Sequence, residues 1–331
     1  MSRLAQYLAY HRESARIGDI DPSYAMLHYL CDRFELSIEQ RYWLAWLYAM
    51  TYCGASVFYA YNEFPDAENV DVVRLQRWWD ASGRKAIITQ TDRRYVKANN
   101  LFVPAFESYR LWLGGRSQAE HFAALTSSPT PEARHATVYA SARRLHSFGQ
   151  FTLFLYLEAL HTITPLDLAP TDLDLNVAHS CRNGLCYAYG LDEWLTVAEA
   201  PMPAAGRDDI LAAWDDLRAR VATAVSPAPT IWATETLLCA FKKFQRDGSR
   251  YIGYYLDRQA IEIAQLADRV RDGVCWDVLW QFRSETYGHT DRAERLLPPA
   301  RLATGGMPPK LKARGHQRTR QVVGDQEFVL L

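Results

Sequence analysis

Long apolar runs are missing from this sequence. The longest, residues 42–50 and 151–157, are much shorter than the roughly 18 residues that a membrane-spanning helix needs. The first residues are polar, and His11, Arg12 and Glu13 follow them, so the apolar core of a secretory signal is also missing. We therefore expect no membrane partner and a cytoplasmic location.

An excess of charge of either sign is missing as well. The chain has 37 basic and 38 acidic residues and a formal net charge of −1. Bulk charge therefore does not indicate a nucleic-acid partner in the way that a strongly basic domain would. Any binding of nucleic acid has to depend on local groups of basic side chains.

Cysteine and glycine motifs are scarce. The 331 residues include six cysteines, of which only Cys181 and Cys186 lie close in sequence, and no Cys-x-x-Cys pair occurs. These spacings exclude a zinc site and a four-cysteine iron–sulfur loop, so we expect free thiols and no bound metal. A glycine-rich phosphate loop and a dinucleotide fingerprint are also missing, and we predict no cofactor.

Helical periodicity is what the sequence has in abundance. With 49% hydrophobic residues, a chain of this length can bury a large core. Apolar residues recur at helical spacing in residues 210–225 and 252–270, which predicts two helices packed on a core. Strand patterns are short and limited to residues 86–89 and 328–331. We therefore predict a mainly α fold.

The polar residues of the second periodic stretch are expected to form a face exposed to water. They are Asp257, Arg258, Glu262 and Asp268.

The end of the chain has a different composition. Between Arg295 and Gly324 there is no acidic residue, while basic residues accumulate among glycines and prolines. This pattern predicts a basic C-terminal extension over residues 298–331. It is either a solvated tail or an arm that contacts DNA phosphates. The candidate phosphate contacts are Lys310, Lys312, Arg314 and Arg318.

Residues 148–194 contain the most informative pattern. An apolar helix follows Phe148, a turn around Thr164 and Pro165 comes next, and a second helix follows with Asp172 and Asp174 near its start. A carboxylate in this position either caps the helix or faces a ligand near its positive end.

This order of helix, turn and helix, with Asp174-x-x-Val177, resembles the core of the helix-hairpin-helix DNA glycosylases. Asp174 corresponds to their catalytic aspartate. The turn at residues 161–167 lacks the Gly-x-Gly hairpin that grips the DNA backbone in those enzymes. A modified use of the scaffold therefore fits better than base hydrolysis.

Residues 24–192 resemble, more specifically, the phage amino acid:DNA transferases, also called α-glutamyl/putrescinyl-thymine pyrophosphorylases. The segments that carry this resemblance are Tyr29-Leu30-Cys31-Asp32-Arg33-Phe34, Glu39-Gln40-Arg41-Tyr42-Trp43, Thr51-Tyr52-Cys53-Gly54, Tyr61-Asn62-Glu63-Phe64-Pro65, Gln90-Thr91-Asp92-Arg93-Arg94-Tyr95-Val96-Lys97 and Ser180-Cys181-Arg182-Asn183-Gly184.

The resemblance implies an enzyme that acts on double-stranded phage DNA in the host cell. A free amino acid or amine displaces phosphate or pyrophosphate from an activated 5-hydroxymethyluracil, which gives a hypermodified thymine. It also implies a two-lobed helical, glycosylase-like (helix-hairpin-helix) catalytic domain over residues 1–297, with lobes of roughly 1–128 and 129–297. The amine, and the choice between direct displacement and elimination followed by addition, stay open.

Basic residues are candidates for binding the anionic groups in this reaction. Arg93, Arg94 and Lys97 lie within five positions, and on a helix Arg93 and Lys97 share a face that suits a charged leaving group. Arg182, beside Asn183, suits a phosphate or a carboxylate. The alternatives are a solvated helix start for the first group and a structural ion pair for Arg182.

Deprotonation of the attacking ammonium needs a general base. Asp174, Asp172 and Glu63 are the candidates, and we favour Asp174 over simple helix capping because it matches the glycosylase aspartate. Tyr61 and Asn62 suit stacking on an extruded base and hydrogen bonding to its edge. Two other functions stay open: a DNA glycosylase that acts on a modified base, and a non-catalytic helical module that binds DNA.

Overall fold

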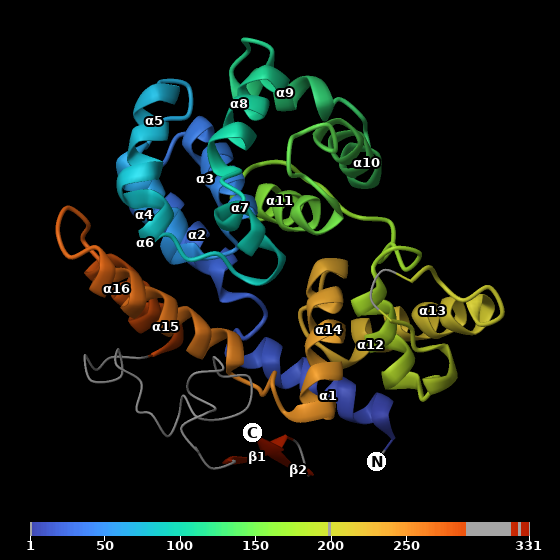
Figure 1. The fold of residues 1–331 in the computed structure, drawn as a ribbon. Helices are drawn as coiled ribbons and strands as arrows, with labels where there is room; N and C mark the ends of the chain where they lie inside the picture. The colour runs from blue at the N-terminus through green and yellow to red at the C-terminus, as the bar shows by residue number, and fades with distance from the viewer. Residues whose placement is uncertain (1, 198–199, 289–318, 324–325, 331) are drawn as a thin grey trace. The chain divides into compact units, whose positions relative to one another are not determined.

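The computed structural model describes residues 2–197, 200–288, 319–323 and 326–330. Its elements are mainly helices (Figure 1), so the predicted α class is confirmed. The chain forms two compact units: unit 1 comprises Met1–Pro22, Thr171–Arg258 and Asp291–Leu331, and unit 2 comprises Ser23–Pro170 and Gln259–Thr290. The predicted lobe division near residue 128 falls within unit 2 and stays a prediction.

Unit 1 is built from both ends and the middle of the chain. Its elements are α1 (Arg3–Ile17), α12 (His179–Tyr189), the 3-10 helix η3 (Asp192–Trp194), α13 (Arg207–Ala224), α14 (Ile231–Asp247), the first turn of α15 (Tyr254–Arg269), β1 (Thr319–Val323) and β2 (Gln326–Leu330). The two strands pair antiparallel, with Thr319 opposite Leu330 and Val323 opposite Gln326.

The core of unit 1 forms where α12 packs on α14. Gly184 makes this approach possible, because a Cβ at this position would lie 2.3 Å from the carbonyl oxygen of Leu238. Tyr7 and Tyr10 of α1 add aromatic contacts with Phe241 of α14, at ring-centroid distances of 5.4 and 5.6 Å. Helices α12 and α14 therefore lie close enough for polar side chains along their contact to interact.

Unit 2 holds most of the helices. They are α2 (Pro22–Arg33), α3 (Ile38–Thr51), α4 (Gly54–Glu63), α5 (Val72–Trp78), the π-helix η1 (Trp79–Gly83), α6 (Arg84–Ala86), the 3-10 helix η2 (Thr91–Arg93), α7 (Arg94–Ala98), α8 (Phe102–Leu113), α9 (Gln118–Leu125), α10 (Pro131–Ala142), α11 (Gln150–Ile163), the remainder of α15 and α16 (Asp277–Tyr287).

Helix α3 lies at the centre of unit 2. Every residue from Tyr42 to Thr51 is buried, as expected of a helix that is apolar on all sides. Ser37 and Gln40 form a capping box that fixes its start. The indoles of Trp43 and Trp46 stack at 4.9 Å, and α11 packs alongside.

Several local predictions can be compared with these elements. The apolar positions of residues 210–221 are buried in α13, and α11 ends at Ile163 before the predicted turn. Residues 328–330 lie in β2, but the predicted strand at residues 86–89 is wrong: Ala86 ends α6, and residues 87–89 form no strand.

The predicted wet face of α15 is wrong for three of its four residues: Asp257 is 4% exposed, Arg258 9% and Glu262 2%, whereas Asp268 faces water. Periodicity finds the apolar stripe of this helix, but it does not reveal that polar positions beside the stripe are covered too.

Candidate functional site

The loop that leads into α12 carries two of the predicted carboxylates, and both are exposed. Asp174 has a φ of 48°, in the left-handed region. Its backbone N–H donates to Asp172 Oδ1 at 2.7 Å, and its carbonyl accepts from the backbone of Val177 and Ala178. The N-cap position of α12 is Ala178, so neither aspartate occupies it. These bonds form a tight turn that presents the carboxylate of Asp174 at the surface.

Arg182 fixes this turn from within unit 1. The side chain is fully buried, and its Nη1 donates to the carbonyls of Leu175 at 2.7 Å and Asn176 at 3.1 Å. Its Nη2 donates to Thr196 Oγ1 at 2.8 Å and to the carbonyl of Ala200 at 2.6 Å. These acceptors are carbonyls and a hydroxyl, not the carboxylate of the predicted ion pair. The observed role of Arg182 is to position the Asp174 turn, and direct contact with a substrate stays a prediction.

Asn183 has a similar positioning role. Its Nδ2 donates to the carbonyl of Thr196 at 2.6 Å, and its Oδ1 accepts from the backbone N–H of Thr196 at 3.1 Å. Together with Gly184 at the α14 contact, three consecutive residues of the segment 180–184 thus serve the packing around α12. Its first residue, Ser180, has a different partner.

A polar cluster lies where the start of α12 meets α14. Lys242 Nζ donates to the carbonyl of Ser180 at 3.1 Å and lies 3.3 Å from its Oγ. One turn earlier on α14, the thiol of Cys239 donates to Glu235 Oε1 at 3.4 Å. Lys243 lies beside Lys242 and is also partly buried. We call Ser180, Glu235, Cys239, Lys242 and Lys243 the α14 cluster.

Burial dominates the electrostatics of the α14 cluster. It raises the pKa of Glu235 to about 7, although the Cys239 thiol and the two lysines oppose this. It also lowers the pKa of Lys242 and of Lys243, and raises the pKa of the Cys239 thiol to about 12. A carboxylate with such a pKa exchanges protons near neutral pH, which is what general acid or base chemistry needs.

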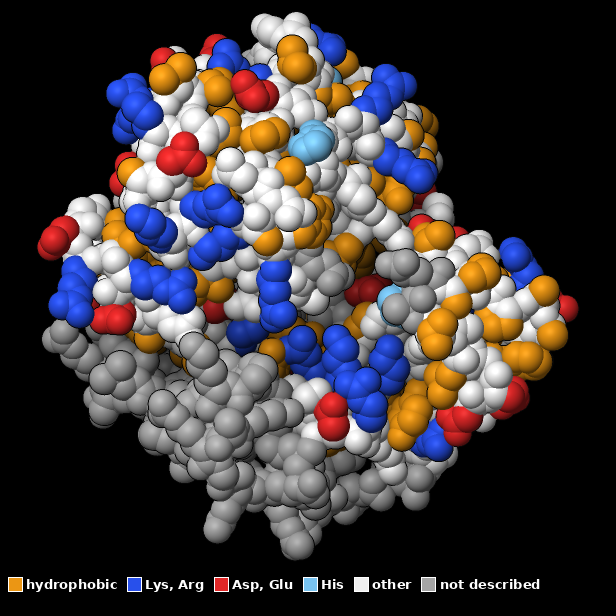
Figure 2. All heavy atoms as spheres, viewed as in Figure 1, with side chains coloured by type: hydrophobic (Ala, Val, Ile, Leu, Met, Phe, Trp, Pro, Cys, Tyr) orange, Lys and Arg blue, Asp and Glu red, His pale blue; other side chains and the backbone are white. Residues whose placement is uncertain are grey.

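Basic side chains continue along the end of α14. The end of α14 carries Lys242, Lys243 and Arg246, which pairs with Asp247, and Arg250 follows in the loop before α15. Lysine and arginine side chains form a patch on the face of the molecule that Figure 2 shows. The guanidinium of Arg250 lies 4.0 Å from the ring centroid of Tyr254. This group of cations suits an anionic ligand such as a phosphate.

Buried acids hold the start of α15. Asp19 accepts from the backbone N–H of Gly253 at 2.7 Å and of Leu256 at 3.0 Å. Tyr251 donates to Asp257 Oδ2 at 2.6 Å. Burial raises the pKa of Asp19 to about 7, against the effect of its backbone hydrogen bonds. Because Asp19 already accepts from the first turn of the helix, we assign it a structural role.

In unit 2, Tyr61, Asn62 and Glu63 form the last turn of α4. Asn62 is exposed and its Nδ2 donates to the carbonyl of Phe58 at 2.7 Å, while Tyr61 and Glu63 are half-buried. Burial raises the pKa of Tyr61 to about 12, so its phenol stays protonated at neutral pH. These side chains offer hydrogen-bonding groups at the surface of unit 2.

The three cations of residues 93–97 have different environments. Arg93 ends η2, is 1% exposed, and donates to Thr152 Oγ1 and to the carbonyl of Ser147. Lys97 donates to the carbonyls of Lys85 and Ile87 at 3.3 and 2.9 Å. Arg94 is exposed. The alternative prediction for this segment, a solvated basic helix start, is therefore wrong for Arg93. Its guanidinium is buried and forms hydrogen bonds within unit 2.

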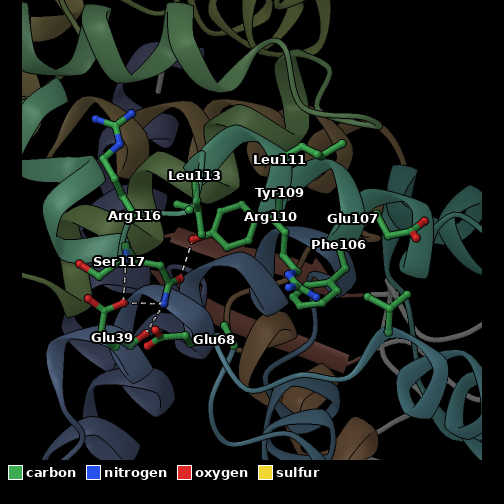
Figure 3. A pocket seen from close by; sticks show the side chains of 14 residues that line it. Glu39, Glu68, Phe106, Glu107, Tyr109, Arg110, Leu111, Leu113, Arg116 and Ser117 are labelled. Carbon is green, nitrogen blue, oxygen red and sulfur yellow. Dashed lines mark hydrogen bonds between the residues drawn. The ribbon is translucent and has the colours of Figure 1, made fainter.

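A separate cavity of about 550 Å³ lies in unit 2 (Figure 3). Its wall includes Glu39, whose carboxylate accepts from the backbone N–H groups of Gln118 and Ala119 at the start of α9. Exposed Glu107 and Arg110 line it as well. None of the residues predicted as catalytic or substrate-binding lines this cavity, and Glu39 is already used to fix α9.

The described residues give two further observations. Among them, no three histidine, cysteine, aspartate or glutamate side chains gather in a way that would hold a metal ion. No helix in the described ranges is both long and apolar enough to cross a membrane. The predicted DNA contacts Lys310, Lys312, Arg314 and Arg318 lie outside the described residues.

The α14 cluster was missed at the level of sequence. A signal was present, because Glu235, Cys239, Lys242 and Arg246 recur at helical spacing on one face of an amphipathic helix. That pattern alone is typical of a solvated face. What distinguishes it is the contact with α12, which covers part of the face and desolvates Glu235.

The comparisons with known proteins agree with the resemblance drawn from sequence. A serinyltransferase of Salmonella phage ViI is 27% identical over 266 residues, which cover 75% of this chain and 63% of that protein. The chain thus spans less than two thirds of the length of that relative. No solved structure matches. The amino acid:DNA transferase family matches residues 15–249, which contain the Asp174 turn and the α14 cluster. The chain therefore belongs to the amino acid:DNA transferase family.

Proposed function

We propose that this protein attaches an amino acid, through its amine, to phosphate- or pyrophosphate-activated 5-hydroxymethyluracil in double-stranded phage DNA. The reaction releases phosphate or pyrophosphate and leaves a carbon–nitrogen bond at the former methyl carbon of thymine. The observation that carries the proposal is the family match over residues 15–249. The relative from phage ViI is named a serinyltransferase, so serine is the first amine to test.

The Asp174 turn is the first part of the proposed machinery. Its carboxylate is exposed on a turn that the buried Arg182 holds by two carbonyls. Such support suits a group that must meet a substrate in one orientation. By its match to the glycosylase aspartate, Asp174 acts on the reacting base, and Asp172 and Glu63 are the other carboxylate candidates from sequence.

Extrusion of the target base from the duplex is the second part of the proposal, because the reacting carbon cannot be reached easily within stacked DNA. Tyr61 and Asn62 are the proposed contacts of the extruded base. Arg94 and Lys97 are proposed to bind the leaving group, and Arg93 and Asn183 to support such contacts from their buried positions. A glycosylase-like helix-hairpin-helix scaffold is part of this proposal.

DNA phosphates need cations at the surface, since neutralised phosphates dominate the affinity of proteins for DNA. In unit 1, the end of α14 and the loop after it supply four basic residues, Lys242, Lys243, Arg246 and Arg250. Lys310, Lys312, Arg314 and Arg318 are proposed as a second group.

The test is mass spectrometry of nucleosides from DNA that carries phosphorylated or diphosphorylated 5-hydroxymethyluracil. The DNA is incubated with the protein and serine, and in parallel with a mixture of amino acids. A nucleoside heavier by one amino acid residue supports the proposal and identifies the amine. A released free base would instead identify a glycosylase, and unchanged DNA would leave only a binding module.

A matched pair of variants tests the Asp174 turn in the same assay. Asp174→Asn should remove the adduct, whereas Asp208→Asn, at an exposed position at the start of α13, should form it at the wild-type rate. Equal rates for both variants would exclude Asp174 from the reaction.

A further inference from the structure

Glu235 is a partly buried carboxylate that the roles proposed so far do not use. Among the described residues, its hydrogen-bond donor is the thiol of Cys239, a weak donor, at 3.4 Å from Oε1. It forms no ion pair with any described residue, although Lys242 and Lys243 lie within electrostatic range. A carboxylate that is desolvated but not closed by an ion pair can still accept an external cation.

The groups that interact with Glu235 come from three helices. On α14 they are Cys239 and the two lysines; on α12, Cys181; on α1, Tyr7. Burial raises the pKa of the Cys181 thiol and of the Tyr7 phenol well above their usual values, and Tyr255 of α15, near Cys239, is raised in the same direction. These three groups are therefore neutral at pH 7, and the charges near Glu235 are those of Lys242 and Lys243.

Lys242 does not neutralise Glu235 because its amine is engaged elsewhere. Its Nζ donates to the carbonyl of Ser180 at 3.1 Å, at the start of α12. The cluster thus presents a carboxylate at one end and lysine amines about two turns further along the same helix. An amine nucleophile at the carboxylate and a DNA phosphate at the lysines are the two charged partners that such an arrangement suits.

We propose that Glu235 is the general base of the transfer: it binds the ammonium group of the incoming amino acid and accepts one proton from it. This inference rests on the proposed function. Lys242 and Lys243 keep the role proposed above, at the phosphates of the DNA, and Arg94 and Lys97 keep theirs at the leaving group. Asp174 then keeps a role at the base ring, and proton removal from the amine passes to Glu235.

The step balances in atoms and charge. One N–H proton of the ammonium moves to a Glu235 carboxylate oxygen, and the nitrogen gains a lone pair. That lone pair forms the carbon–nitrogen bond at the methylene carbon, while the carbon–oxygen bond to the phosphate breaks and its electron pair leaves with the phosphate. The product amine is protonated, and Glu235 releases its proton to water before the next turnover.

The direction of the pH dependence follows from this role. Glu235 can accept a proton only when it is ionised, and burial raises its pKa to about 7. The single-turnover rate should therefore fall as the pH falls through about 7. Above the pKa of the free amine, the nucleophile is neutral without help from the protein, and a base is no longer needed.

The experiment compares single-turnover adduct formation by wild type, Glu235→Gln, Asp174→Asn and Glu193→Gln across the pH range. Glu193 is exposed in unit 1 and provides the same change of charge. At pH 7.5 we expect Glu235→Gln to be roughly 100-fold slower than wild type, as is usual for loss of a general base. This loss should shrink to less than about tenfold at alkaline pH, because only the missing base is bypassed.

Each outcome decides between the two proposals. Absence of any adduct with wild type would refute the proposed function. A wild-type adduct with an unchanged rate in Glu235→Gln, or with a loss that is equal at every pH, would overturn the inference about Glu235. If alkaline pH restores the rate of Asp174→Asn but not that of Glu235→Gln, Asp174 is the general base. Because rescue requires a folded protein, it also separates a catalytic loss from misfolding.

Discussion

The Asp174 turn and the α14 cluster both adjoin the start of α12, yet charge is used differently in them. In the turn, the cation is Arg182, which is fully buried and whose guanidinium meets four oxygen atoms. In the cluster, the lysines are partly buried, and among the residues that the structure describes the donor to Glu235 is a thiol. A buried cation that donates to several backbone carbonyls stabilises that part of the backbone. A half-buried group with few partners keeps its capacity for chemistry.

The largest effect should come from the turn. Arg182→Ala leaves four oxygen atoms, one buried and three partly buried, without this donor and opens a cavity, so we expect a loss of about 3–5 kcal/mol in the free energy of unfolding. Arg182→Lys should restore little, because an ammonium cannot reproduce the fork of a guanidinium. Thermal and denaturant unfolding measure both, and Arg94→Ala, at an exposed position, is the control. A loss of less than about 1 kcal/mol in the free energy of unfolding would show that the Asp174 turn is stable without Arg182.

The helix contact beneath both regions should give a smaller effect. Gly184→Ala places a Cβ 2.3 Å from the carbonyl oxygen of Leu238, and overpacking of this kind costs about 1–3 kcal/mol. Gly149→Ala is a matched control, since its Cβ would meet nothing within 4 Å. Denaturant unfolding of both variants is the measurement. If the two variants are equally stable, α12 and α14 can move apart to accommodate the Cβ without loss of stability.

The basic end of α14 should affect DNA affinity more than stability. If Lys242 and Lys243 each neutralise one phosphate, the double change to glutamine should lower the slope of log affinity against log salt by about two. Fluorescence anisotropy of labelled duplex DNA at several salt concentrations measures this slope. The control is the double variant Arg116→Gln, Arg143→Gln, at exposed positions of unit 2. If it lowers the slope equally, the effect comes from the loss of any two cations and not from α14.

The smallest expected effect concerns the donor to Glu235. Cys239→Ser replaces a weak thiol donor by a hydroxyl, which favours the ionised carboxylate more strongly. The acid limb of the rate profile should therefore move to lower pH by less than about one unit, since one such hydrogen bond is worth about 1 kcal/mol. A shift to higher pH would indicate that the thiol does not donate to Glu235 in solution.

Local pattern was sufficient for part of this molecule. The apolar repeat of residues 210–221 predicted α13, and the proline-bearing turn after residue 163 marked the end of α11. The family was identified from short segments spread over residues 24–192, and residues 15–249 confirm it. In each case the information lies in neighbouring residues or in a set of motifs, so no knowledge of packing between distant segments was needed.

Burial of charge could not be predicted in this way. Arg93 looked like one of three exposed cations, but its guanidinium donates to Thr152 and Ser147, more than 50 positions later in the sequence. Asp257 and Glu262 looked like a wet face and are buried. Glu235 was not predicted as a functional residue, because burial is what raises its pKa and burial is not visible in the sequence of α14. Desolvation depends on which elements cover a residue, and periodicity within one helix does not encode that.

The capping of α15 by Asp19 has a consequence for synthesis. Unit 1 joins the first 22 residues to a segment that begins at Thr171, and Asp19 accepts hydrogen bonds from the backbone of Gly253 and Leu256, more than 200 positions later. At ribosomal rates of about 5–20 residues per second, the start of α15 is therefore synthesised on the order of 10 s or more after α1. Most of unit 2, Ser23–Pro170, is synthesised within that interval. During that interval the apolar face of α1, with Tyr7 and Tyr10, is a natural target for a chaperone that binds nascent chains.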